Sequence, residues 1–200
     1  MRQPKGITIM NRTFRSTSLL LLGLLPACAS EPYQASAQDQ QQRQQAVTQY
    51  GNLIVPGVGI GPVKLGMGMD EVRARLGEPD SADTDSEGNV AAWNYYSMNL
   101  RIGFTASATP SVNSVSTSVN VIKPVTFGAQ TWDDGYPVQT VFQLDNGIKL
   151  GSTSFDVQRA FGDYSEPGGG AGILMQYPNG LFFRVTKHDH RVVFIEVANF

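Results

Sequence analysis

A fourteen-residue stretch that occurs twice constrains the fold more than any other feature of the sequence. The first copy runs from Lys64 to Gly77 and the second from Lys149 to Gly162, an offset of 85 residues without a gap. Each copy begins with Lys-Leu-Gly and ends with an apolar residue followed by Gly. That order is typical of a strand end, a glycine turn, a short helix and a glycine stop. We therefore expect a tandem duplication of one small α+β unit.

Each copy predicts one short helix, over residues 69–76 and 154–161. The second copy offers a capping-box-like pair, Thr153 with Asp156, whereas the first has Gly68 at the corresponding N-cap position. Eight residues make only about 12 Å of helix, and a helix this short is stable only when it is docked on other elements. We expect each helix to pack on the strands of its own unit.

Segments with strand character follow each predicted helix, separated by polar or Gly/Pro-rich turns. The predicted strands are 90–96, 100–104, 112–122, 138–144, 173–177, 181–186 and 192–197. The expected fold class is therefore α+β, a short helix packed on a three- to four-stranded antiparallel meander, written twice. The two repeats are assigned to residues 52–122 and 123–200. Because one such unit is small for a stable core, the two should share a core or one continuous sheet.

The N-terminus predicts export and a lipid anchor. Residues 1–27 have the basic start and short apolar run of a signal peptide, with Met1 or Met10 as the first residue. The only cysteine, Cys28, follows Leu25-Pro26-Ala27, which resembles the lipobox of bacterial lipoproteins. The alternative is ordinary cleavage before Ser30, which would leave no lipid and release a secreted protein.

The residues after Cys28 favour the outer membrane and a periplasm-facing domain. Ala29, rather than Asp, follows the cysteine, and by resemblance to Gram-negative sorting this indicates the outer membrane. Residues 28–51 are rich in Gln and are expected to form a flexible tether. A helix from Asp39 to Tyr50 is possible within it, but the sequence gives this helix no apolar face to bury. Without residues 1–27 the chain keeps 11 basic and 17 acidic residues, a net charge of −6, which disfavours nucleic acid as a partner.

Candidate catalytic and metal-binding groups are few. His188 and His190 could lie on one side of a strand as metal ligands, but their surroundings favour a turn. Asp80, Asp83, Asp85 and Glu87 lack the spacing of a calcium loop and are interpreted as a solvated acidic loop. Residues 168–170 are three glycines without the Lys-Ser/Thr of a phosphate-binding loop. We therefore expect no enzyme activity, no metal and no cofactor.

Large aromatic side chains are the best candidates for contact with a protein partner, because Trp and Tyr are enriched at the centres of protein interfaces. About half of them should face the core if they lie on strands. The candidate partner-binding residues are Trp93, Tyr95, Tyr96, Trp132, Tyr136 and Tyr177.

The motif around the first helix resembles a known family. Asp70-Glu71-Val72, Leu76-Gly77-Glu78-Pro79 and Trp93-Asn94-Tyr95 are similar to the small outer-membrane-assembly lipoproteins of the BamE/SmpA type. Duplicated, the unit resembles the β-lactamase inhibitor protein, whose tandem repeats set helices against a sheet with a concave binding face. The resemblance implies a protein-binding module.

The expected function is that of a lipid-anchored cell-envelope protein that binds another envelope or secreted protein, with outer-membrane protein assembly or envelope integrity as the process. The alternative is an inhibitor of a secreted or periplasmic enzyme, which would use a concave face and the acidic loop of residues 80–87. A small enzyme or ligand carrier is disfavoured because no nucleophile, base and orienting group can be assembled from so few ionisable residues.

Overall fold

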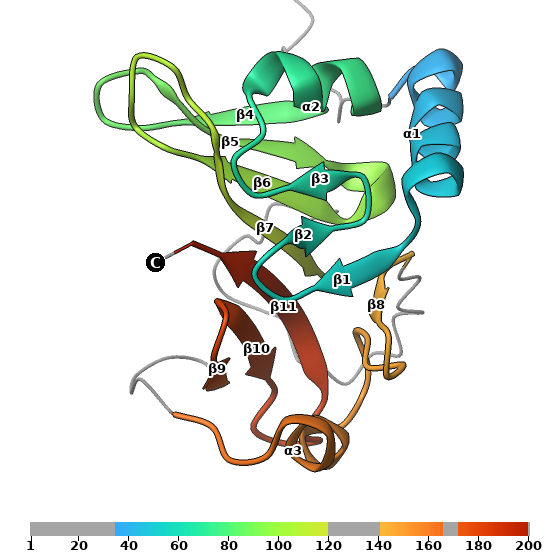
Figure 1. The fold of residues 1–200 in the computed structure, drawn as a ribbon, viewed down its shortest axis with the longest axis vertical. Coiled ribbons are helices and arrows are strands. Elements are labelled where there is room, and N and C mark those ends of the chain that lie inside the picture. Colours follow the sequence, from blue (N-terminus) through green and yellow to red (C-terminus); the bar gives the residue numbers. More distant parts are fainter. Residues whose placement is uncertain (1–34, 120–140, 166–171, 200) are drawn as a thin grey trace, which may run out of the picture. The chain divides into compact units, whose positions relative to one another are not determined.

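A computed structural model describes residues 35–119, 141–165 and 172–199, which all belong to one compact unit, residues 33–200. The helices are α1 (Ala37–Tyr50), α2 (Met69–Leu76) and α3 (Ser154–Phe161), with a short 3₁₀ helix, η1 (Tyr96–Met98). The α+β class is confirmed (Figure 1). Among the described residues, none of the helices has both the length and the apolar character needed to cross a membrane.

The strands form two sheets. The smaller has the order β3-β2-β1-β8, and the larger has the order β4-β5-β6-β7-β11-β10-β9. The small sheet contains β1 (Leu53–Val55), β2 (Gly59–Ile60), β3 (Val63–Lys64) and β8 (Gln143–Leu144). The large sheet contains β4 (Ser81–Thr84), β5 (Val90–Tyr95), β6 (Leu100–Phe104), β7 (Val112–Ser118), β9 (Ile173–Tyr177), β10 (Leu181–Val185) and β11 (Val192–Ala198).

The positions of α2 and α3 match the sequence prediction residue for residue. In α3 the predicted capping box is present, because the Thr153 hydroxyl accepts from the Asp156 N–H while the Asp156 carboxylate accepts from the Thr153 N–H. Gly77 and Gly162 follow the two helices at φ values of 75° and 80°, which L side chains rarely adopt. Local signals of the chain are therefore sufficient to place both helices.

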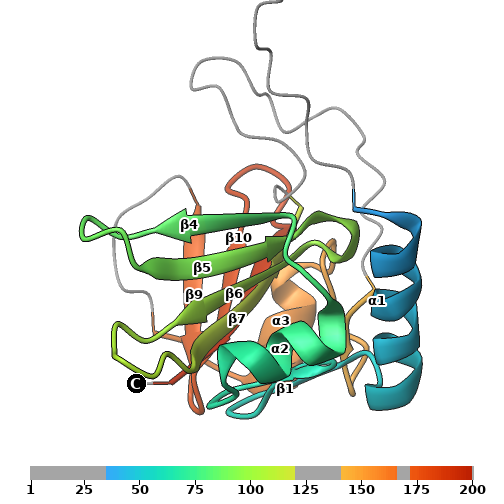
Figure 2. The same cartoon turned by 90° about the horizontal axis from the view of Figure 1, so that it is seen from above.

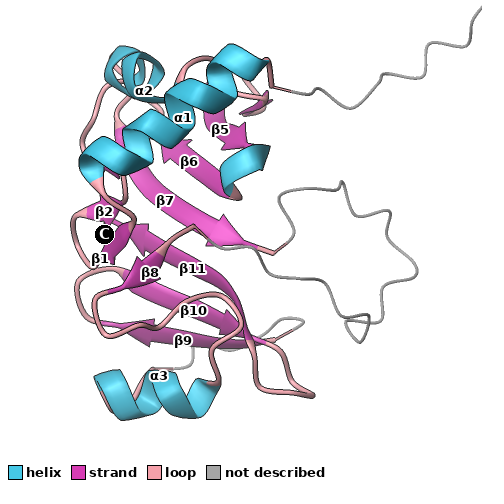
Figure 3. Ribbon diagram, turned by 90° about the vertical axis from the view of Figure 1, so that its right-hand side faces the viewer, coloured by secondary structure: helices cyan, strands magenta, loops and turns pink. Residues whose placement is uncertain are grey.

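The core lies between one face of the large sheet and the elements packed on it. Val72 and Leu76 of α2 and Val157 of α3 are fully buried in this core. Strand β2 of the small sheet contacts the central strands β7 and β11. Figures 1 and 3 show the small sheet on the same side of the large sheet as α2. Within the described residues, buried side chains from both halves of the chain form one core, and strands from both halves form the large sheet.

Each half of the chain holds its glycine turn to a strand by the same pair of hydrogen bonds. The bonds are Gly66 N–H to Val112 O and Val112 N–H to Met67 O in the first half, and Gly151 N–H to Val192 O and Val192 N–H to Ser152 O in the second. A tyrosine hydroxyl also donates to the carbonyl of each helix-ending glycine, Tyr95 to Gly77 at 3.1 Å and Tyr177 to Gly162 at 3.3 Å. These bonds close each helix onto its own strands.

The two halves meet at corresponding residues of β7 and β11. Ser116 lies four residues after Val112, and Glu196 lies four residues after Val192. The antiparallel pairing of β7 with β11 sets Ser116 directly opposite Glu196. Because equivalent residues of the two halves face each other, the paired strands β7 and β11 are related by an approximate local two-fold axis.

Two strand predictions differ from the structure. The stretch expected as an acidic loop, residues 80–87, contains edge strand β4, which pairs with β5 in spite of its polar sequence Ser-Ala-Asp-Thr. The strand predicted over 138–144 is reduced to Gln143–Leu144 within the described residues. Polar edge strands lack the alternation on which the prediction relied, because few of their side chains face the core.

The flexible tether predicted over residues 28–51 is wrong for its second part. Residues 37–50 form α1, which Ser36 caps, and the helix packs beside α2 (Figure 3). Its buried residues are Arg43 and Ala46. An arginine buried in an ion pair gives no apolar stripe in the sequence, and so the docked face was missed. Residues 28–34 lie outside the described residues.

Candidate functional site

The second face of the large sheet is the candidate binding surface. Side chains alternate along each strand, and those pointing away from the core form a row from Asn94 through Arg101, Ser116 and Glu196 to Gln176. In this row Arg101 is exposed, Glu196 and Gln176 are half-buried, and Asn94 and Ser116 are buried. No helix or strand of the described part of the chain lies over this face (Figures 1 and 3). We call it the open face.

Charged and aromatic groups are concentrated on the open face. Arg101 of β6 pairs with Asp83 of β4, with 3.1 Å between Nη2 and Oδ2. Arg184 of β10 lies over the ring of Phe194 on β11, 5.6 Å from its centroid. Both arginines are exposed, whereas Phe194 is half-buried. Mixed charge and aromatic area on a flat sheet surface is suited to contact with a protein rather than to enclosing a small ligand.

Glu196 lies near the centre of the open face. Burial raises the pKa of this carboxyl above its usual value, and the Ser114 hydroxyl and the charges of Arg101 and Arg184 only partly oppose the effect. Among the described residues, Glu196 has no cationic nitrogen within 4 Å. The open face therefore carries one partly desolvated acceptor between two cations.

Most of the aromatic residues predicted to bind a partner are in the core. Trp93, Tyr95 and Tyr177 are buried, so their prediction as contact residues is wrong. Burial raises the pKa of Tyr95, and it raises the pKa of Tyr177 to about 12, because the charged phenolate loses its solvation. Tyr96 is half-buried with its hydroxyl 2.7 Å from the Ser81 hydroxyl. Trp132 and Tyr136 lie outside the described residues.

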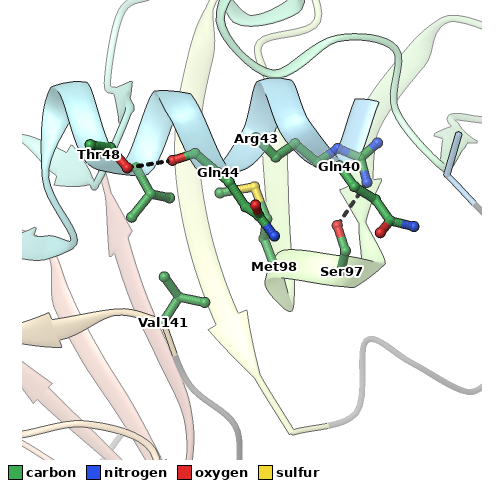
Figure 4. Close-up of a pocket in the computed structure, with 8 residues that line it drawn as sticks. Gln40, Arg43, Gln44, Thr48, Ser97, Met98 and Val141 are labelled. Carbon is green, nitrogen blue, oxygen red and sulfur yellow. Dashed lines mark hydrogen bonds between the residues drawn. The ribbon is translucent and has the colours of Figure 1, made fainter. Parts of the chain in front are cut away.

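A groove between α1 and η1 is the second candidate site (Figure 4). Its volume is about 420 Å³, and it is lined by Gln40, Arg43, Gln44, Val47, Thr48, Ser97, Met98 and Val141. Among the described residues that line it, the groove has no acidic or basic side chain other than Arg43.

Arg43 is not available to a ligand in the groove, because all five of its N–H donors are used. Nη1 and Nη2 donate to the two oxygens of the Asp80 carboxylate at 3.0 and 2.8 Å. The remaining donors reach the Ser97 hydroxyl, the Glu78 carbonyl and, from Nε, the Leu76 carbonyl. The guanidinium also lies 4.9 Å from the centre of the Tyr95 ring. The arrangement holds α1 to the end of α2 and to β5.

The acidic residues of the first half do not form one cluster. Asp80 is buried against Arg43, whereas Asp83 lies on strand β4, where it is exposed and pairs with Arg101. Asp85 accepts from the N–H groups of Glu87 and Asn89, and these bonds hold the pKa of Asp85 below its usual value. No group of three or more His, Cys, Asp or Glu side chains among the described residues is placed to hold a metal ion.

The two histidines lie in the turn between β10 and β11, as the sequence indicated. His188 and His190 are both exposed, and His190 has a φ of 54°. The Thr186 hydroxyl donates to the Asp189 carboxylate within the same turn, which lowers the pKa of Asp189. These contacts stabilise the turn. The glycines at 168–170 lie outside the described residues.

Comparison with known proteins gives no family. No protein-family model matches the chain, and no curated protein matches it. One similar solved structure is an extracellular protein containing an SCP domain from Bacillus anthracis str. Ames, with a TM-score of 0.39 and 12% identity, covering 68% of this chain and 44% of that one. Another is a DUF4309 family protein (YjgB) from Bacillus subtilis subsp. subtilis str. 168, with a TM-score of 0.42 and 15% identity, covering 80% of this chain and 99% of that one. The chain spans less than half the length of the first of these proteins.

Proposed function

We propose that the protein is a lipid-anchored cell-envelope protein that binds another envelope protein through the open face of its large sheet. The anchor is supported by the signal-peptide pattern of residues 1–27 and by the lipobox-like sequence before Cys28. Both lie outside the described residues. The binding role is supported by the open face, and the resemblance to outer-membrane-assembly lipoproteins makes assembly of outer-membrane proteins the process to test first.

Duplication of one unit is part of this proposal. Equivalent hydrogen bonds at both glycine turns and the opposed pair Ser116 and Glu196 support descent of the two halves from one module. Two copies joined through β7 and β11 give one wide sheet from two narrow ones. A rigid, preformed surface loses little conformational entropy on binding, so such a sheet is a good platform for recognition.

The observation that carries the binding role is the row of charged and polar side chains across the open face. A contacting protein could satisfy Glu196 with a basic side chain while it covers Phe194. In the groove beside α1, by contrast, all N–H donors of the charged residue, Arg43, already have hydrogen-bond acceptors within the protein.

Site-specific photocrosslinking in cells tests this role. A photoreactive residue in place of Arg184 or Gln176, both on the open face, is expected to give a discrete adduct with another protein. The same residue in place of Gln41, on the solvent side of α1, is the matched control and should give none. Equal labelling at all three positions, or none at any, contradicts binding by the open face.

Inhibition of a secreted or periplasmic enzyme is the second candidate, and one feature favours it. The turn between β4 and β5 projects beyond the sheet (Figure 2) and carries half-buried Asp85 and exposed Glu87. Such a turn could enter an active-site cleft. In that case the crosslinked adduct would be obtained from Glu87 and would contain a soluble enzyme.

A further inference from the structure

An exposed apolar surface begins where α1 ends. Tyr50 is the last residue of α1, Leu53 and Val55 point to the same side of β1, and Val58 follows in the turn after β1. Each of these four side chains is 41–44% exposed, whereas Ile54 between them is 2% exposed. We call these four residues the β1 surface.

The chain segment that carries the β1 surface has no acidic residue of its own, although Asp145 directly follows the strand that pairs with β1. No Asp or Glu occurs from Val47 to Met69, although the chain carries 17 acidic residues in all. The guanidinium of Arg75 lies over the Tyr50 ring at 4.4 Å from its centroid, and it also pairs with the Glu71 carboxylate at 2.7 Å. A tyrosine beside an arginine at the border of an aliphatic patch suits a membrane–water interface, because both side chains have an apolar body and a polar end.

The size of the β1 surface argues against a protein as its occupant. A stable protein interface uses about 20–30 residues from each side, and the β1 surface has four. A small apolar surface is sufficient for contact with a lipid bilayer when another anchor already holds the protein at the membrane. Tethering replaces a weak bimolecular binding step by a local one at high effective concentration.

The length of chain between Cys28 and the β1 surface lets both reach one bilayer. Eight residues separate Cys28 from Ala37, the first residue of α1, and fully extended they span about 28 Å. Helix α1 adds 14 residues, or about 21 Å at 1.5 Å each. Because α1 is docked and not a loose tether, the folded unit is held within a short distance of the lipid attached to Cys28.

We propose that the β1 surface lies on the lipid bilayer to which Cys28 anchors the chain; this rests on the proposed anchoring. Leu53 and Val55 point away from the core, on the far side of the small sheet from the large one. Contact of the β1 surface with lipid therefore turns the open face of the large sheet away from the membrane. The anchored protein would present its binding face to proteins outside the bilayer.

Fluorescence on tethered protein tests the proposal without natural lipidation. The chain from residue 28 onward, with Cys28→Ser and an N-terminal hexahistidine tag, is held on vesicles of phosphatidylcholine and phosphatidylethanolamine that contain a nickel-chelating lipid. This chain keeps the whole compact unit. Val55→Cys then carries the only thiol and is labelled with an environment-sensitive NBD dye. The matched control is Glu87→Cys on the turn between β4 and β5, labelled in the same way.

The expected result is a blue shift and a several-fold rise in NBD emission at position 55 on the vesicles, reversed by imidazole, with no change at position 87. Adding Leu53→Thr and Val58→Thr to the labelled chain should reduce this change, while circular dichroism confirms that the fold is kept. Equal emission at positions 55 and 87 overturns the proposal. A blue shift that appears without vesicles as protein concentration rises also overturns it, since it would indicate a second copy as the occupant. A vesicle-dependent shift combined with an unmodified Cys28 in cells would leave the β1 surface standing and refute the anchor alone.

Discussion

Replacement of Arg43 by Met tests whether α1 is part of the folded unit. Both partners of the ion pair between Arg43 and Asp80 have side chains that are only 2% exposed. The Arg43→Met variant keeps the aliphatic length but leaves the Asp80 carboxylate buried without a charge partner. Removing one member of a buried pair destabilises a protein by about 3–5 kcal/mol. At about 2–4 °C per kcal/mol for a chain of this size, the melting temperature should fall by about 6–20 °C.

The assay is urea unfolding at neutral pH, with an exposed ion pair of the same chain as the control. Arg101 and Asp83 are 45% and 49% exposed, and so Arg101→Met should cost less than about 1 kcal/mol. A double variant with Asp80→Asn should recover much of the loss, because it removes the uncompensated charge. If Arg43→Met costs no more than Arg101→Met, α1 is not docked and residues 28–51 are a tether after all.

Three further variants test the core, the open face and the helix ends. Thr117 has a buried hydroxyl without a hydrogen-bond partner among the described residues. Thr117→Val should therefore raise the free energy of unfolding by about 1 kcal/mol. A lower free energy of unfolding in this variant would indicate that the hydroxyl is hydrogen-bonded. Glu196 has a raised pKa, so its contribution to stability is present below pH 4.5 and is lost as the pH rises through the folded-state pKa. The Glu196→Gln variant should therefore have a higher melting temperature than the unchanged protein at about pH 7 but not at about pH 4. Equal shifts of the melting temperature at both pH values would contradict this. In urea unfolding, Gly77→Ala should lower the free energy of unfolding more than Gly162→Ala does. Both glycines have positive φ, but only a Cβ at Gly77 would meet α1, at 2.9 Å from Asp39 Oδ1. Equal losses of free energy for the two variants would refute this packing.

Features encoded within a few residues were predictable from the sequence. Both eight-residue helices have an N-cap and a glycine stop within ten residues, and the strand at Leu100–Phe104 alternates apolar with polar or small residues. The turn before β10 has Asn179 and Gly180 at positive φ, which the Asn-Gly sequence favours. These elements needed no knowledge of their tertiary partners.

Features that depend on distant partners were missed. The docked face of α1 is formed by Arg43 and its partner Asp80, 37 residues away, and no hydrophobic period reveals such a pair. Trp93 and Tyr95 lie two residues apart on β5 and so share one face, but the sequence alone did not show that this face is the buried one. Trp93 and Tyr95 lie opposite Ile102 and Leu100 on the paired strand β6, and these apolar partners indicate that the shared face is buried.

The open face could be located only after the sheet order was known. Ser116 and Glu196 are 80 residues apart in the chain and lie opposite each other only because β7 pairs with β11. Nothing in the local sequence indicates which strands of the two halves meet. The candidate surface therefore comes from the topology and not from a motif.

Intact-mass analysis of the mature protein extracted from membranes tests the anchor most directly. We expect a chain that begins at Cys28 and carries a diacylglyceryl group on its sulfur. A water-soluble chain that begins at Ser30 without lipid would contradict the anchoring, which is the central claim of the account.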